Sequence, residues 1–426
     1  MYEGESYMNF LNLSSWNVGH VYEEEDRYVV VVQPTSFLRV CPSCENTTLS
    51  KHGSDAQTIR DFPMHGKWVF IQINHQRYRC TACRKTCYHP LSEVDAKRFM
   101  TRRLVAYIER KTLSTNRTFS SIAEEIGVDP RTIRNIFDDA VARLNQTVAF
   151  ETPTILGIDE LHVLGAPRGV LTNLEAHTIL DLLKDRKKSS IIHALQHLKN
   201  SDHVRTVVID LWRPYREAIR AILPDTVIVC DKFHVLKLVT TALEMFRKEI
   251  SAQLSESQRK TLKMHDRYLL LRRQHDLTPE QCFLLETWTK NYPLLGQAHQ
   301  LKEQFFKIYD NQTLTEAHTA YLAWVKDVPS ELMHIYQPLM LTIEEWGEYI
   351  FNHFEQDHIT GGFVESANNV ARMLNRIGHG YSLPVLRARL LYGMRGIKDG
   401  NRGAVSGESV DRPSQGIAIS TLIGQQ

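Results

Sequence analysis

Long apolar runs and a strong net charge are both missing from this sequence of 426 residues. No apolar stretch approaches the roughly 20 residues that a membrane-spanning helix needs, so no membrane partner is expected. The N-terminus has no basic segment followed by an apolar one, which argues against a signal peptide. The formal net charge is only +2, so the overall charge does not indicate a partner. We therefore expect a cytoplasmic protein.

Cysteine is also scarce, and its spacing favours an intracellular metal site over a disulfide framework. Four of the seven cysteines form two separate pairs, Cys41-Pro-Ser-Cys44 and Cys80-Thr-Ala-Cys83. Each pair can place two thiolates around a tetrahedral zinc ion, and strands between the pairs would make a zinc ribbon. Structural Zn²⁺ would supply folding energy, because such a module is too small to be stable through its core alone. Cys87 and His89 lie nearby and could replace one ligand.

Acidic residues are absent between Lys67 and Cys87, whereas basic residues are frequent there. A local basic patch suits contact with phosphate groups. The residues expected to contact DNA beside the cysteines are Arg77, Arg79, Arg84 and Lys85. A purely structural zinc module is the alternative interpretation.

Residues 119–137 have the pattern of a helix-turn-helix. Apolar residues recur at helical spacing on both sides of Gly127, which allows a sharp turn. Asp129 can cap the second helix, and Pro130 suits its first turn. The residues that would point outward, where a recognition helix meets the major groove, are Arg131, Thr132, Arg134 and Asn135. The alternative is an ordinary helical hairpin with a solvated basic face.

From residue 154 to residue 235 the predicted elements follow the order β-β-β-α-β-α-β. The predicted strands are 154–164, 169–174, 178–183, 204–211 and 227–230, and the predicted helices are 189–198 and 215–223. This is the order of an RNase H-like fold, an α/β architecture whose mixed sheet gathers acidic residues at neighbouring strand ends. The charged, helical sequence that follows predicts a large all-helical insertion.

These patterns divide the chain into segments. In order they are an N-terminal zinc-ribbon region (1–95), a helix-turn-helix DNA-binding domain (96–150), the first part of the RNase H-like catalytic domain (151–235), the all-helical insertion (236–360), the final helices of the catalytic domain (361–398) and a tail (399–426). The tail is rich in Gly, Ser and Pro, which predicts disorder.

Three acidic residues far apart in the chain are the candidates for catalysis. Asp159 and Asp210 each end an apolar β-type run, in strands that the predicted topology places side by side as a parallel pair. Glu365 must arrive from the helix after the insertion. Carboxylates placed in this way can hold two Mg²⁺ or Mn²⁺ ions and drive phosphoryl transfer. With the DNA-binding patterns upstream, this predicts an enzyme that cuts and joins DNA.

The helix that begins near Gly362 would present a polar face, because its polar residues recur at three- and four-residue steps. These residues are Glu365, Asn368, Asn369, Arg372 and Arg376. A face that joins a metal-binding acid to Asn and Arg suits a site that binds a phosphodiester. A solvated polar face is the alternative.

Asp231 competes with Asp210 for the place of the second metal-binding acid. It closes the fifth predicted strand and starts the segment Asp-Lys-Phe-His, which ends at His234. It could bind the metal or support the site through hydrogen bonds. We prefer Asp210, and the residues alone leave the role of His234 open.

The sequence resembles the DDE transposases of bacterial insertion sequences, specifically the ISL-three group. The matching elements are the two cysteine pairs, the helix-turn-helix and the segments 157–160, 208–215, 227–235 and 365–381. In related families a C-or-D-x-x-H signature follows the second catalytic acid, which assigns that role to Asp210 and the signature to Asp231 and His234. One departure is visible: many members have Gly after the glutamate, where this chain has Ser366.

The resemblance implies a transposase with N-terminal recognition of terminal inverted repeats and Mg²⁺-dependent cleavage and strand transfer. Its partners would be double-stranded DNA, both element ends and target, bound by a homodimer or larger assembly at the bacterial nucleoid. Two alternatives are a transposase-derived regulator that binds DNA without catalysis, and an RNase H-like nuclease without strand transfer.

Overall fold

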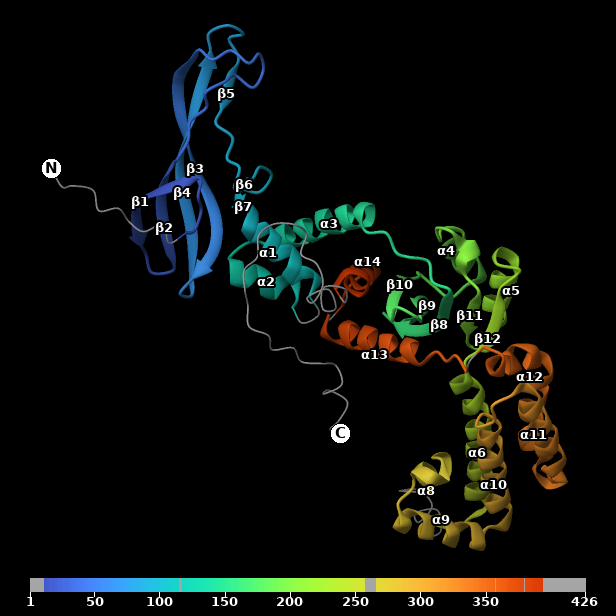
Figure 1. Cartoon of the computed structure of the whole chain (residues 1–426). Coiled ribbons are helices and arrows are strands. Elements are labelled where there is room, and N and C mark those ends of the chain that lie inside the picture. Colours follow the sequence, from blue (N-terminus) through green and yellow to red (C-terminus); the bar gives the residue numbers. More distant parts are fainter. Residues whose placement is uncertain (1–10, 115–116, 257–265, 357, 379, 394–426) are drawn as a thin grey trace.

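The computed structural model describes residues 11–114, 117–256, 266–356, 358–378 and 380–393. Figure 1 shows the described parts in chain order: a twisted N-terminal sheet, a group of three helices, a mixed α/β core and a long helical arm. The predicted disordered tail, residues 399–426, lies outside the described residues.

The N-terminal sheet is larger than a zinc ribbon. Its strands are β1 (Trp16–Glu23), β2 (Arg27–Pro34), β3 (Leu49–Met64), β4 (Lys67–Cys80), β5 (Thr86–Tyr88), β6 (Val94–Asp95) and β7 (Met100–Thr101). They run in the order β1-β2-β4-β3-β7-β6, and β5 pairs with β4. Alternate residues of β2 and β4 are buried, including Val30, Val32 and Ile71, so one face of this sheet forms a core of its own. The cysteine pairs lie at one end of the long β3–β4 hairpin.

Three helices follow, α1 (Arg102–Leu113), α2 (Phe119–Ile126) and α3 (Pro130–Thr147). The predicted turn is confirmed. Gly127 ends α2 in the left-handed conformation with φ 71°, which is unfavourable for residues with a Cβ atom. The Asp129 side chain accepts a hydrogen bond from the backbone of Arg131 at 2.7 Å and so caps α3.

Polar contacts fix the N-terminal sheet to these helices. Asp61 on β3 is buried and accepts hydrogen bonds from the Thr101 hydroxyl and the Arg103 guanidinium. At the helical turn, a Cβ atom on Gly127 would lie 2.4 Å from the Trp68 ring, so only glycine permits this close approach. The sheet and the helix-turn-helix therefore form one unit rather than two modules on a flexible linker.

The second sheet has five strands in the order β10-β9-β8-β11-β12, as the sequence predicts for an RNase H-like fold. They are β8 (Ile155–Val163), β9 (Ala166–Asn173), β10 (Thr178–Leu182), β11 (Thr206–Ile209) and β12 (Val227–Cys230), with α4 (Lys188–Gln196) and α5 (Arg213–Ile222) between them. β8, β9 and β10 form an antiparallel meander, whereas β8, β11 and β12 are parallel.

Side chains alternate between the two faces of this sheet. Val207 and Ile209 pack with α4 and α5, while Val208 packs with Val364 and Ala367 on the opposite face. The latter two belong to α13 (Gly362–Ile377), which is followed by α14 (Leu383–Ala388) and a short π-helix (Arg389–Gly393). The sheet is therefore covered on both faces.

The helical arm between β12 and α13 contains α6 (Lys232–Gln253), α8 (Asp266–Leu271), α9 (Pro279–Asn291), α10 (Pro293–Ile308), α11 (Leu314–Asp327) and α12 (Met333–Phe351). It corresponds to the predicted all-helical insertion, and Figure 1 shows it projecting from the core beside β12. Across the described residues, no helix has the length and apolar character that a membrane span requires.

Candidate functional site

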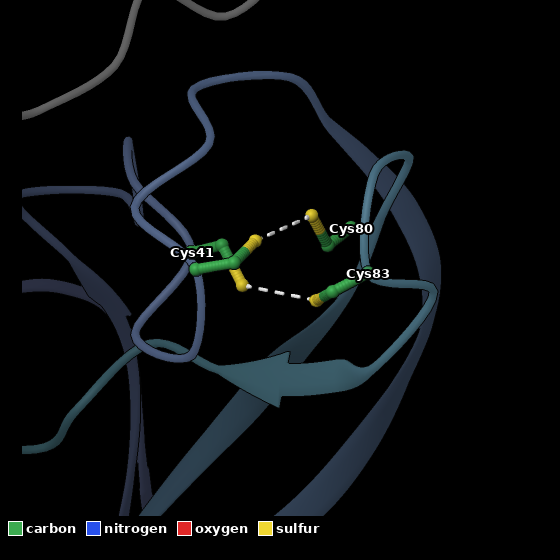
Figure 2. Close-up of side chains that lie close together, drawn as sticks. Cys41, Cys80 and Cys83 are labelled. Atoms are coloured by element: carbon green, nitrogen blue, oxygen red, sulfur yellow. Dashed lines mark hydrogen bonds between the residues drawn. The ribbon is translucent and has the colours of Figure 1, made fainter.

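The four paired cysteines converge at the end of the N-terminal hairpin. Cys41 Sγ lies 3.7 Å from Cys83 Sγ, and Cys44 Sγ lies 3.6 Å from Cys80 Sγ, as Figure 2 shows for the facing knuckles. All four ligand atoms lie within 4.8 Å of one another. Zn–S bonds of about 2.3 Å in a tetrahedron place sulfur atoms about 3.8 Å apart, so the group fits zinc. Zn²⁺ is the structural cofactor here.

Local geometry lowers the pKa values of two of these thiols, Cys41 and Cys80. The backbone N–H groups of Ser43 and then Cys44 point at Cys41 and lower the pKa of its thiol to about 6, which favours the thiolate that zinc binds. The alternative ligand His89 is directed elsewhere, since its Nε2 lies 3.3 Å from the Ser36 hydroxyl. The group whose ligand atoms lie close enough to share a metal is the set of four cysteines, and it includes neither Cys87 nor His89.

Register brings the aspartates to one edge of the second sheet. Ile158, Ile209 and Cys230 pair across the three parallel strands β8, β11 and β12. The residue after each of them, Asp159, Asp210 or Asp231, therefore lies in a row of side chains near the carboxyl ends of the strands. Asp210 and Asp231 come two residues after Val208 and Val229, which face α13, so these carboxylates face α13 as well.

Helix α13 lies close over this row. Gly157 shares the face of Asp159, and a Cβ atom there would lie 3.1 Å from Val364 on α13. The close approach lets Asn368 Nδ2 donate a hydrogen bond of 2.8 Å to Asp159 Oδ2. Glu365 lies one turn earlier on the same helix, exposed at the surface of the same cavity.

The acids share a cavity of about 470 Å³. Its lining residues come from β8, the ends of β11 and β12, the start of α6, and α13, and they are Asp159, Glu160, Asp210, Asp231, Phe233, His234, Lys237, Gly361, Glu365, Asn368 and Arg372. Every residue predicted for catalysis or its support is in this set. Glu160, Phe233 and Lys237 are members that the sequence interpretation did not single out, although Glu160 directly follows Asp159.

Burial of the three aspartates makes their ionised form unfavourable. The pKa of Asp210 is raised to about 8 by burial first and then by the neighbouring Asp159 and Glu160 carboxylates. Burial also raises the pKa values of Asp159 and Asp231. The Oδ1 atom of Asp210 is buried and has no hydrogen-bond partner among the described residues. A hard divalent cation such as Mg²⁺, which takes carboxylate oxygens as ligands, would favour the ionised form of these groups and offset their mutual repulsion.

Asp231 has different surroundings. It caps α6 by accepting a hydrogen bond of 3.2 Å from the backbone of Phe233. The backbone of Gly361, at the start of α13, also interacts with its carboxylate, and a Cβ atom on Gly361 would lie 2.5 Å from Asp231 Oδ2. The carboxylate oxygens of Asp231 therefore hold the starts of two helices.

Basic groups surround the acids. His234 Nε2 lies 3.6 Å from Asp159 Oδ1. Arg186 forms an ion pair with Glu160, and its guanidinium stacks 4.1 Å from the Trp212 ring centroid. Arg372 and Lys237 line the cavity from α13 and α6. These charges suit a polyanionic substrate.

The residues predicted to contact DNA lie outside this cavity. Arg79, Arg84 and Lys85 are exposed beside the zinc-binding cysteines, whereas Arg77 is half-buried and donates a hydrogen bond of 2.9 Å to the His52 carbonyl. On α3, three of the four predicted residues are exposed and Thr132 is half-buried; the exposed ones are Arg131, Arg134 and Asn135. Arg376 is exposed on α13, beyond the cavity lining.

Comparison with known proteins identifies the family. A family described as transposase, of the DDE type and the ISL3 group, matches residues 156–390, more than half of the chain. The zinc-finger of transposase IS204/IS1001/IS1096/IS1165 matches residues 38–83, and the helix-turn-helix domain of transposase family ISL3 matches residues 90–141. The transposase for insertion sequence element IS1001 from Bordetella parapertussis is 22% identical over 363 residues, which cover 83% of this chain and 87% of that protein. The chain belongs to the ISL3 family of DDE transposases, enzymes of DNA transposition that bind DNA through a helix-turn-helix.

Proposed function

We propose that Asp159, Asp210 and Glu365 are the metal-binding acids of DNA cleavage and strand transfer. The observation that carries this proposal is their common place on one cavity, although they come from three distant parts of the chain. Two bound Mg²⁺ or Mn²⁺ ions would activate the attacking oxygen and stabilise the departing one. Asp210 is the second acid rather than Asp231, because its Oδ1 has no partner among the described residues whereas Asp231 caps α6.

The other cavity residues have supporting roles. Asn368 holds Asp159 through its hydrogen bond, and its own Oδ1, buried and without a partner among the described residues, faces the same region. His234 restrains the second oxygen of Asp159. Arg372 and Lys237 bind the phosphates on either side of the scissile bond. The chemistry needs no covalent link between protein and DNA, so no Ser or Tyr nucleophile is assigned.

The N-terminal unit would recognise the terminal inverted repeats of the element. Arg131, Thr132, Arg134 and Asn135 on α3 would read the major groove, while Arg77, Arg79, Arg84 and Lys85 beside the zinc centre, together with Arg376 on α13, contact phosphates. Because two ends must be cut and joined to one target, the active form is a homodimer or a larger assembly on DNA in the bacterial cytoplasm.

A cleavage assay tests the proposal. A duplex carrying the DNA end that flanks the coding sequence is incubated with Mg²⁺, a target plasmid and the purified full chain. Wild type should nick the end and join it to the plasmid, whereas Asp159→Asn should lose both activities by at least roughly 100-fold. Asp225→Asn, a change at an exposed turn before β12, is the matched control and should retain activity.

The products separate the alternatives. Nicking without joined plasmid would indicate a nuclease of the same fold. Specific binding without Mg²⁺-dependent nicking would indicate a DNA-binding regulator. Full activity of Asp159→Asn would overturn the assignment of the acids.

A further inference from the structure

One residue that lines the acidic cavity, Phe233, is an aromatic residue exposed to solvent. Phe233 lines this cavity, yet 49% of the residue is exposed. A single exposed aromatic residue is common on protein surfaces and by itself indicates nothing. Its position beside the acids is the informative feature.

The backbone of Phe233 is held at a fixed place relative to the acids. Phe233 is in the first turn of α6, and its backbone N–H donates to the capping carboxylate of Asp231. The next residue, His234, reaches to 3.6 Å from Asp159. The start of a helix of 22 residues therefore positions the Phe233 ring together with the acids.

Cationic side chains flank the ring. Lys232 Nζ lies 5.7 Å from the centroid of the Phe233 ring, and Lys237 lines the cavity one turn further along α6. Arg372 lines the cavity from α13. An aromatic face among phosphate-binding cations is the arrangement by which proteins hold single-stranded nucleic acid, because the cations follow the backbone and the ring stacks on a base.

The shape of the site restricts which base can stack there. Bases inside a duplex already stack on both neighbours, so an open ring gains contact only with a base that has left the helix. A cavity of about 470 Å³ is of the size that holds small ligands, not a duplex. A cavity of this size has room for a phosphate and a neighbouring nucleotide, and the Phe233 ring lines the same cavity as the acids.

We propose that Phe233 stacks on an unpaired base next to the scissile phosphate and so stabilises the opened DNA end during cleavage. The inference deepens the proposed function and depends on it. Phe233 is then a positioning residue for the DNA strand, and its contribution should matter most where opening the duplex is costly.

The test compares two substrates at saturating protein and Mg²⁺. One is the fully paired element end, and the other is the same end with mismatched pairs at the cleavage site. Phe233→Ala and Phe233→Leu should each slow cleavage of the paired end roughly 5- to 150-fold, while Phe233→Trp stays within about threefold of wild type. On the mismatched end, Phe233→Ala should recover to within about threefold of wild type. Met245→Ala, on the same helix with 53% exposure but outside the cavity, should match wild type on both substrates.

Each other outcome counts against the inference. Equal losses on both substrates, no loss on either, or full activity of Phe233→Leu would show that stacking on an unpaired base is not the role of this ring. If wild type itself cuts neither substrate, the proposed function fails and the inference falls with it. If wild type cuts and only the substrate dependence is missing, the inference alone is wrong.

Discussion

At the residue scale, Asp210 is a buried carboxylate whose burial the protein compensates only in part. Its Oδ1 has no hydrogen-bond partner among the described residues, and its neighbours are acidic. A bound divalent cation offsets this repulsion, so it should stabilise the folded chain as a ligand does. We predict that Mg²⁺ or Mn²⁺ raises the melting temperature of wild type, and that Asp210→Asn removes most of this increase. Asp225→Asn should respond as wild type does; an unchanged response of Asp210→Asn would contradict the prediction.

His353 gives a pH dependence that is separate from the acids. It is fully buried between α12 and α13, with Nδ1 placed 3.0 Å from the Ile359 carbonyl, and burial lowers its pKa to about 4. Because the folded pKa is below the unfolded value, the neutral ring stabilises the fold above pH 6.5, and this stability is lost as pH falls towards 4. The loss should reach about 3 kcal/mol at most. Denaturation curves measured between pH 7.5 and 4.5 should therefore show that the free energy of unfolding falls more steeply with falling pH in wild type than in His353→Asn. If it falls equally in both proteins, His353 is not the cause of the pH dependence.

Some of the site could be predicted from single residues and some could not. Asp159 and Asp210 each come directly after an apolar run that is typical of a strand. Their place at one edge of the sheet could therefore be predicted from these runs and from the predicted pairing of the two strands. The bond between Asn368 and Asp159 joins residues 209 positions apart and depends on how closely α13 approaches β8, which no local pattern specifies.

At the element scale, the zinc centre should hold the end of the long hairpin. Many residues of β3 near the cysteines are exposed, so pairing and metal rather than a core stabilise this end. We predict one zinc per chain by elemental analysis. Chelation, or Cys44→Ser, should accelerate amide hydrogen exchange in residues 38–88 and leave the strands β8 to β12 unchanged. Equal exchange with and without zinc would show that the metal is not structural.

The elements differ in how well the sequence predicts them. β8, β10 and β12 match their predicted bounds within two residues, because buried strands read as continuous apolar runs. β3 and the full length of β4 were not predicted, since exposed hairpin strands lack that pattern. Strand β1 in the poorly patterned N-terminal region was missed for the same reason.

At the scale of the whole molecule, the catalytic core packs against the helix-turn-helix and forms hydrogen bonds with it. Arg389 is fully buried, and its Nη2 donates to the Arg117 carbonyl at 2.8 Å, as does the Tyr381 hydroxyl at 3.2 Å. The Arg389 guanidinium also lies 5.5 Å from the Phe119 ring centroid. Phe137 of α3 belongs to the same apolar cluster as α13 and α14, so the proposed boundary near residue 150 crosses a shared core.

This contact of Arg389 and Tyr381 with the Arg117 carbonyl should contribute to the global stability of the chain. Arg389→Met leaves the Arg117 carbonyl and the Tyr381 hydroxyl buried without this partner, and should lower the free energy of unfolding by about 1–3 kcal/mol. Tyr381→Phe removes two hydrogen bonds, the one that the hydroxyl donates to the Arg117 carbonyl and the one that it accepts from Arg389, and should cost about 2–3 kcal/mol. Urea denaturation followed by circular dichroism measures both. If Arg389→Met left the free energy of unfolding unchanged, other contacts would hold the two domains together.

The central claim is that three distant carboxylates bind the same cations. Anomalous scattering from Mn²⁺ in crystals of the full chain bound to its element end tests it most directly. The account predicts two Mn²⁺ peaks in the acidic cavity, with oxygens of Asp159, Asp210 and Glu365 as ligands. Peaks held by other side chains, or an absence of peaks in a cavity that holds the scissile phosphate, would contradict it.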